Sequence, residues 1–80
     1  MSINDLSYKV RGAMFEVYKT LGPGLLESIY ESALVYELEL MGLSVKRQVA
    51  LPLKYKNIKL DINLRIDIIV EDQIILEIKA

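Results

Sequence analysis

The spacing of apolar residues changes once along this 80-residue chain, at Gly42. Before Gly42, apolar side chains recur every three or four residues, which is the period of one face of a helix. After Gly42, they form short runs and alternations rich in β-branched residues, which are typical of strands. Helices followed by strands predict an α/β domain of the α+β kind, in which the helices pack on one face of a mostly antiparallel sheet.

Two helices are predicted in the first half of the chain. The first covers about residues 6–21, and the Gly-Pro-Gly link at residues 22–24 ends it, because glycine accepts a left-handed C-cap and proline cannot continue the helix. The second covers about residues 25–41, with Glu27 in its first turn. On this second helix, three glutamates are expected to lie on the exposed face: Glu31, Glu37 and Glu39.

Three or four strands are predicted in the second half. The first covers residues 45–55 and contains Pro52, which indicates an edge position or a bulge because proline cannot donate to the ladder. Residues 58–61 are predicted to form a short returning strand, and residues 64–70 and 74–79 form the two strands that are densest in β-branched side chains.

The three-residue link at residues 71–73 predicts the register of the last two strands. Pairing Val70 with Ile74 places Asp67 opposite Glu77 and makes the other face wholly apolar, whereas a two-residue link would mix polar and apolar residues on both faces. Two carboxylates directly opposite each other repel, so this pairing predicts a divalent cation between them.

The composition limits the chemistry of such a site. The chain has no cysteine and no histidine, which excludes thiolate and imidazole ligands and nucleophiles that depend on them. Oxygen ligands favour hard cations such as Mg²⁺, Mn²⁺ or Ca²⁺. A cation held by Asp67 and Glu77 would polarise a phosphate oxygen and activate a water, and Lys79 lies on the same strand face as Glu77. The alternative interpretation of Glu77 and Lys79 is a solvated strand face.

The net charge of −1 does not indicate a nucleic-acid partner, but the basic residues are unevenly distributed along the chain. Half of the ten basic residues lie in one stretch without an acid and are candidate nucleic-acid contacts: Lys46, Arg47, Lys54, Lys56 and Lys59. The alternative is a solvated hairpin face. No apolar run is long enough to cross a membrane, and the N-terminus lacks the features of a signal peptide, so a cytoplasmic protein is expected.

An acid on one strand and Glu-x-Lys on the next, after a helix that bears a glutamate, resembles the PD-(D/E)XK nuclease pattern. The sequence Gly-Leu-Leu-Glu-Ser-Ile-Tyr at residues 24–30 resembles the signature of the GxxExxY proteins, a prokaryotic branch of that superfamily. Gly-Pro-Gly at residues 22–24, Arg-Gln-Val at 47–49 and Arg-Ile-Asp at 65–67 also resemble this family. The resemblance covers about residues 10–80.

The resemblance implies hydrolysis of nucleic-acid phosphodiesters, with DNA favoured over RNA, by a water that Mg²⁺ or Mn²⁺ activates. It implies that Asp67 and Glu77 ligate the metal, together with the main-chain carbonyl of Ile78.

Further roles follow from the same resemblance. Lys79 corresponds to the catalytic lysine, and Glu27 to the helix acid that approaches the metal or its water. Tyr30, one turn after Glu27, would support it. The predicted register puts Arg65 beside the acids, as their ion-pair partner or as a phosphate contact.

The chain differs from the superfamily pattern after Glu-x-Lys, where a crossover helix and a further strand normally follow. We therefore expect residues 1–80 to form a single but incomplete restriction-endonuclease-like core, either as a piece of a longer protein or completed by another subunit. The open edge of the sheet would favour a homo-oligomer. Two alternatives to a nuclease stay open: a catalytically inactive module that oligomerises or binds a protein, and a nucleic-acid binder without cleavage.

Overall fold

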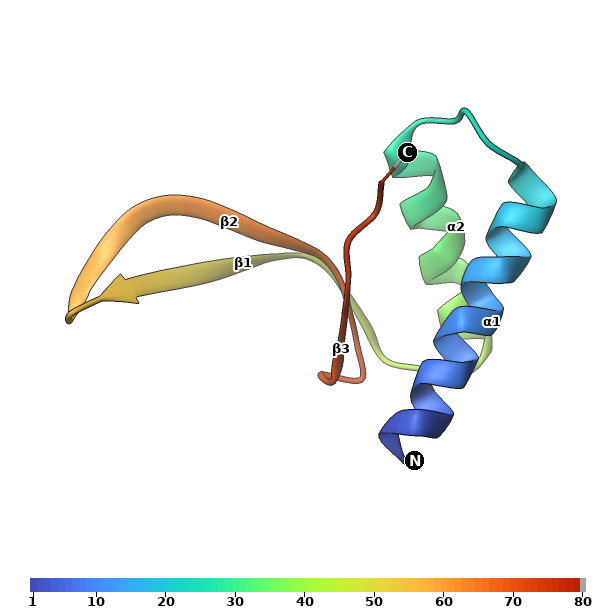
Figure 1. Cartoon of the computed structure of the whole chain (residues 1–80), viewed down its shortest axis with the longest axis horizontal. Helices are drawn as coiled ribbons and strands as arrows, with labels where there is room; N and C mark the ends of the chain where they lie inside the picture. The colour runs from blue at the N-terminus through green and yellow to red at the C-terminus, as the bar shows by residue number, and fades with distance from the viewer. Residues whose placement is uncertain (80) are drawn as a thin grey trace.

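The computed structural model describes residues 1–79, and the side chains of all of these except residues 62 and 63. Ala80, the last residue of the predicted domain, lies outside the described residues. The elements follow in the order α1 (Ile3–Leu21), α2 (Glu27–Leu40), β1 (Val45–Tyr55), β2 (Ile58–Val70) and β3 (Ile74–Leu76). Figure 1 shows the two helices packed side by side at one end, with β1 and β2 reaching away from them. The predicted α+β architecture is confirmed.

The first helix begins three residues before its predicted start. Ser2 takes the N-cap position, and its side chain accepts a hydrogen bond from the Asp5 main-chain nitrogen at 3.1 Å. The helix ends as expected at Gly22, whose φ of 71° is accessible to glycine without steric cost. The buried stripe of α1 faces the second helix and the sheet and consists of Leu6, Val10, Ala13 and Val17.

The link between the helices is held by Tyr30 of α2. The Tyr30 hydroxyl donates to the carbonyl of Gly22 at 2.6 Å and accepts from the main-chain nitrogen of Leu25 at 3.1 Å. Its ring is 4% exposed and stacks on Tyr18 of α1 with 5.5 Å between centroids. Tyr30 therefore shapes the loop that leads into Glu27, the first residue of α2.

Replacing Tyr30 by phenylalanine should lower the free energy of unfolding by about 1–2 kcal/mol, because two partly buried hydrogen bonds are lost while the ring packing is kept. Urea unfolding followed by circular dichroism measures this. Tyr36→Phe is the matched control, since Tyr36 is 62% exposed and should change stability little. Equal losses in the two variants would contradict a structural role for the Tyr30 hydroxyl.

Among residues 1–79, the sheet has three antiparallel strands in the order β1-β2-β3. The two strands predicted over residues 58–61 and 64–70 are one continuous strand, β2, so the lower of the expected strand counts is correct. The ladder is irregular between Leu51 and Leu53, as Pro52 predicts. The predicted register of the last two strands is confirmed for three pairs, from Val70–Ile74 to Ile68–Leu76.

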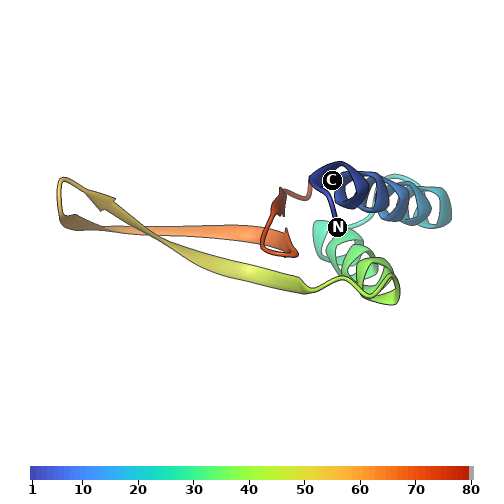
Figure 2. The same cartoon turned by 90° about the horizontal axis from the view of Figure 1, so that it is seen from below.

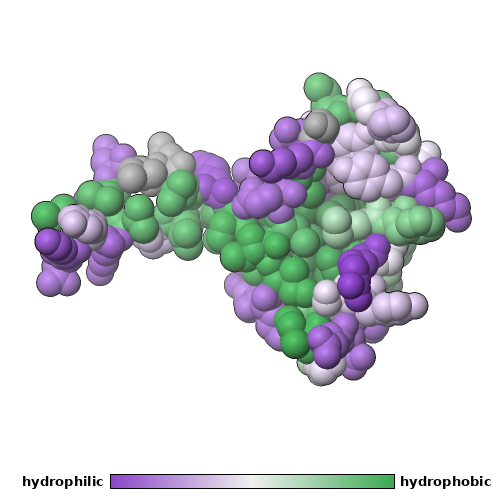
Figure 3. Space-filling model, in the orientation of Figure 1, coloured by the Kyte–Doolittle hydropathy of each residue, from purple (hydrophilic) through white to green (hydrophobic). Residues whose placement is uncertain are grey.

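The core lies where the helices cover the C-terminal part of β2. Ile68 and Val70 are both 0% exposed, and Leu38 of α2 is equally buried. Residues 49–66 of β1 and β2 extend beyond the helices as a two-stranded ribbon, which we call the arm (Figure 2). Figure 3 shows hydrophobic side chains at its surface. No helix in the described part of the chain is long and apolar enough to cross a membrane.

Candidate functional site

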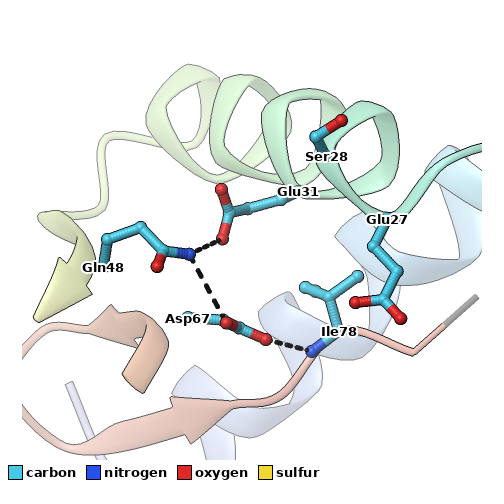
Figure 4. A pocket seen from close by; sticks show the side chains of 6 residues that line it. All are labelled: Glu27, Ser28, Glu31, Gln48, Asp67 and Ile78. Atoms are coloured by element: carbon cyan, nitrogen blue, oxygen red, sulfur yellow. Dashed lines mark hydrogen bonds between the residues drawn. The ribbon is translucent and has the colours of Figure 1, made fainter. Parts of the chain in front are cut away.

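A pocket lies between the first turns of α2 and the sheet. Its lining comes from four parts of the chain and consists of Glu27, Ser28, Glu31, Gln48, Asp67 and Ile78 (Figure 4). Three of these six residues carry carboxylates. Two of the three, Glu27 and Asp67, are residues that the sequence predicts for the metal site.

Asp67 connects the pocket to the chain segment after β3. One carboxylate oxygen, Oδ2, accepts a hydrogen bond from the main-chain nitrogen of Ile78 at 2.8 Å. The other, Oδ1, lies 3.4 Å from the side-chain nitrogen of Gln48, a long contact. The two donors together orient the carboxylate within the pocket. Asp67 is half-buried, so its carboxylate is partly sheltered from water.

Glu31 is also part of this pocket, and its predicted exposure is wrong. The residue is 8% exposed. Its Oε2 accepts from Arg47 Nη2 at 3.0 Å, and its Oε1 accepts from Gln48 Nε2 at 2.8 Å. A signal for this position was available, because Glu31 follows Glu27 by four residues and so lies on the same helix face.

Gln48 joins the two sides of the pocket through its backbone conformation. Its φ of 50° lies in the left-handed region, which costs a non-glycine residue about 1–2 kcal/mol. Successive side chains in a regular strand point to opposite faces, yet Arg47 and Gln48 both reach Glu31. The strained residue therefore places one amide between Glu31 and Asp67, as Figure 4 shows. Sequence reasoning did not identify Gln48 as a site residue.

Glu77 and Lys79 lie elsewhere. The pairing of β3 with β2 ends at Leu76, one residue before the expected partner of Asp67. Both residues line a second, mainly apolar pocket, whose other members are Met14, Val17, Tyr18, Tyr30, Leu34 and Ile78. The ladder stops at Leu76 because the main-chain nitrogen of Ile78 donates a hydrogen bond to the Asp67 side chain instead of to the main chain of a neighbouring strand. The described structure thus brings Asp67 to Glu27 and Ile78, but not to Glu77 and Lys79.

The model of the PD-(D/E)XK nuclease superfamily matches residues 4–80 of this chain. The chain belongs to the PD-(D/E)XK nuclease superfamily. Its two helices, antiparallel sheet and strand-borne acid are consistent with that fold. None of the curated proteins and none of the solved structures matches the chain.

PD-(D/E)XK nucleases generally use divalent metal ions, and the donors around this pocket are of the right chemical type. Carboxylates and main-chain carbonyls are the ligands that hard cations prefer. The set of acidic ligands is smaller than three, since no three acidic side chains among residues 1–79 are close enough together to hold a metal ion. The charge of Glu31 is already compensated by Arg47 at 3.0 Å, whereas both donors to Asp67 are neutral, which leaves Asp67 and Glu27 as the acidic candidates.

The basic residues of β1, β2 and the turn between them fall into two groups in this PD-(D/E)XK chain. Near the helices, Lys46 contacts Asp72 at 2.8 Å and Arg47 contacts Glu31 at 3.0 Å, so the charge of each is compensated. The other predicted nucleic-acid contacts, Lys54, Lys56 and Lys59, lie exposed on the arm, as does Arg65. The described residues contain no ion pair between Arg65 and Asp67. The predicted role of Arg65 as the ion-pair partner of the site's acids therefore has no support in these contacts.

Proposed function

We propose that this chain is a nuclease-like domain of the GxxExxY branch, in which the pocket at the start of α2 binds Mg²⁺ or Mn²⁺ and supports hydrolysis of nucleic-acid phosphodiesters, DNA in particular. The observation that carries the proposal is the convergence of Glu27, Asp67 and the main chain of Ile78 on one pocket from three distant parts of the sequence. A cytoplasmic location fits such a substrate.

The residues of the pocket have separate roles in this proposal. Asp67 is the central ligand, and Gln48 keeps it oriented from the side of β1. Glu27, exposed at the mouth of the pocket, holds a water or completes the set of oxygen ligands. When bound, the divalent cation supplies a polarised phosphate and a more acidic water.

Glu77 and Lys79 enter the proposal through the strand register. Continuing the observed pairing by one residue beyond Ile68–Leu76 puts Glu77 opposite Asp67, on the polar side of the hairpin. Lys79 then follows on the same side. We propose that β3 adopts this extension when a cation competes with the Ile78 amide for the Asp67 carboxylate.

Isothermal titration with Mn²⁺ tests the metal site. The unmodified protein should bind Mn²⁺, and Asp67→Asn should lose measurable binding because the amide removes the charge of the central ligand. Asp72→Asn is the matched control, since Asp72 is an exposed acid at the β2–β3 turn and should bind like the unmodified protein. Equal Mn²⁺ binding by the Asp67→Asn and unmodified proteins would contradict the site.

The proposed competition at Ile78 has its own readout. In nitrogen–proton correlation spectra, the Ile78 amide should shift as Mg²⁺ is added, and the same resonance should already be shifted in Asp67→Asn, because both changes remove its carboxylate acceptor. The Gln73 amide, which donates to the carbonyl of Val70 at 3.0 Å in the turn, should stay in place and serves as the control. An Ile78 amide that ignores Mg²⁺ would speak against the extension of β3.

A second candidate function is an inactive module that forms homo-oligomers or binds a protein. The exposed apolar side chains of the arm favour it, among them Tyr55 at 58% and Ile58 at 62% exposure. Three measurements separate the two functions. A dimer in light scattering that binds no Mn²⁺ in calorimetry would favour the module. A metal-dependent loss of intact DNA on a gel would favour the nuclease.

A further inference from the structure

The arm has two chemically different faces. Residues opposite each other in an antiparallel pair point to the same side of the sheet. The pairs Leu51–Leu64, Leu53–Leu60 and Tyr55–Ile58 make one side apolar. The other side carries the pairs Lys54–Lys59 and Ala50–Arg65. We call the latter the basic face. Lys56 lies in the turn at the tip, where its ammonium is 5.5 Å from the ring centroid of Tyr55.

The basic face is unfavourable for the isolated chain. Lys54 and Lys59 are directly opposite each other, and like charges at opposed positions destabilise a pair of strands. Asp61 is the single acid among residues 49–66, against four basic residues. No ion pair involves these four residues in the described part of the chain, whereas Lys46 and Arg47 near the helices are both paired. The arm thus carries four basic residues without an ion pair on one two-stranded ribbon.

We infer that the basic face of the arm binds the phosphate backbone of a nucleic acid, and that the arm, rather than the helical end of the molecule, supplies most of the electrostatic affinity. A polyanion would relieve the Lys54–Lys59 repulsion, and a two-stranded ribbon has the width that the major groove of DNA admits. This inference rests on the proposed function only in taking nucleic acid as the ligand.

The strand that carries the basic face also carries the acid of the candidate site. Arg65 precedes Asp67 by two residues on β2 and therefore lies on the same side of that strand. A backbone held by Lys54, Lys59 and Arg65 would run along β2 toward the pocket. The arm would then position a phosphodiester for the site without contributing to the metal ligands.

The salt dependence of DNA binding tests the inference. Anisotropy of a short labelled duplex is measured over a salt series for the unmodified protein and for the triple variant Lys54→Gln, Lys56→Gln, Lys59→Gln. Each lysine that contacts a phosphate contributes about 0.9 to the slope of log K against log salt, so the triple variant should lose up to about 2.7 from that slope. The matched control replaces three exposed cations of α1 by glutamine: Lys9, Arg11 and Lys19.

The control variant has the same change in net charge and should keep the slope of the unmodified protein. Equal loss of slope in the two variants, or no binding of DNA by the unmodified protein, would overturn the inference. Should the triple variant fail to fold, Lys54→Gln and Lys59→Gln alone should each lose about 0.9.

Two further measurements separate this inference from its competitors. If the arm instead packs on a second copy through its apolar side, Tyr55→Ser will abolish a dimer in light scattering while the lysine variants bind DNA normally, which would overturn the inference. Mn²⁺ titration of the triple variant should match the unmodified protein. Failure of the arm to bind DNA therefore leaves the metal site intact, and failure of the metal site leaves the salt slope intact.

Discussion

Replacing Ile68 by alanine should lower the free energy of unfolding by about 2–5 kcal/mol, because a fully buried side chain of the central strand is lost and a cavity remains. Ile68 is 0% exposed and lies in the middle strand of the sheet, beneath the helices. A domain of this length has a total stability of about 4–12 kcal/mol. The substitution would therefore remove a large part of the stability of the domain.

Urea unfolding followed by circular dichroism measures this loss. Ile75→Ala is the matched control, since Ile75 is an isoleucine of β3 with 57% exposure and little buried area to lose. We expect the control to change stability by less than about 1 kcal/mol, mostly through β-propensity. Comparable losses in the two variants would show that the core does not lie on the side of the sheet where the structure places it.

Replacing Arg47 by methionine should lower the free energy of unfolding by about 1.5–3 kcal/mol, because it removes a hydrogen bond to a charged group and leaves the carboxylate of Glu31 short of a partner. The Glu31 side chain is 11% exposed, whereas that of Arg47 is 44% exposed. The pair is thus only half-sheltered, and the loss should stay below the 3–5 kcal/mol or so that breaking a fully buried pair costs.

A double-mutant cycle identifies the origin of this loss. Glu31→Met added to Arg47→Met removes the unpaired charge together with its partner, so the double variant should recover part of the stability. Lys46→Met is the control, because it breaks the exposed pair with Asp72, whose contribution should stay within about 1 kcal/mol. If Arg47→Met costs no more than Lys46→Met, the contact between α2 and β1 does not hold the pocket together.

The general fold was predictable because it depends on patterns that are local in the sequence. The change of period at Gly42 separates helices from strands, and the Gly-Pro-Gly link ends α1 where expected. The β2–β3 register followed from one turn and the alternation of apolar side chains, since a shift by one residue would expose the whole core face. The irregularity at Pro52 followed from the missing amide of proline. Each of these features depends on neighbours within a few residues.

The site was only partly predictable. Glu27 and Asp67 were identified from the motif, and the structure brings both to one pocket. The burial of Glu31 could not be read from its polarity, because it depends on Arg47 and Gln48, which lie 16 and 17 residues further along the chain. The left-handed backbone of Gln48 was equally hidden, since glutamine has no preference for that conformation.

The sequence by itself determined the order of the elements, the register of the last hairpin and the identity of the strand-borne acid, because periodicity and turn length act locally. The tertiary structure alone decided which polar groups meet. It placed Glu31 and Gln48 beside Asp67, and it ended the ladder at Leu76, so that Glu77 and Lys79 line a second pocket. The reason is that a hydrogen bond such as that from Ile78 to Asp67 depends on the spatial packing of distant segments, which no local pattern encodes.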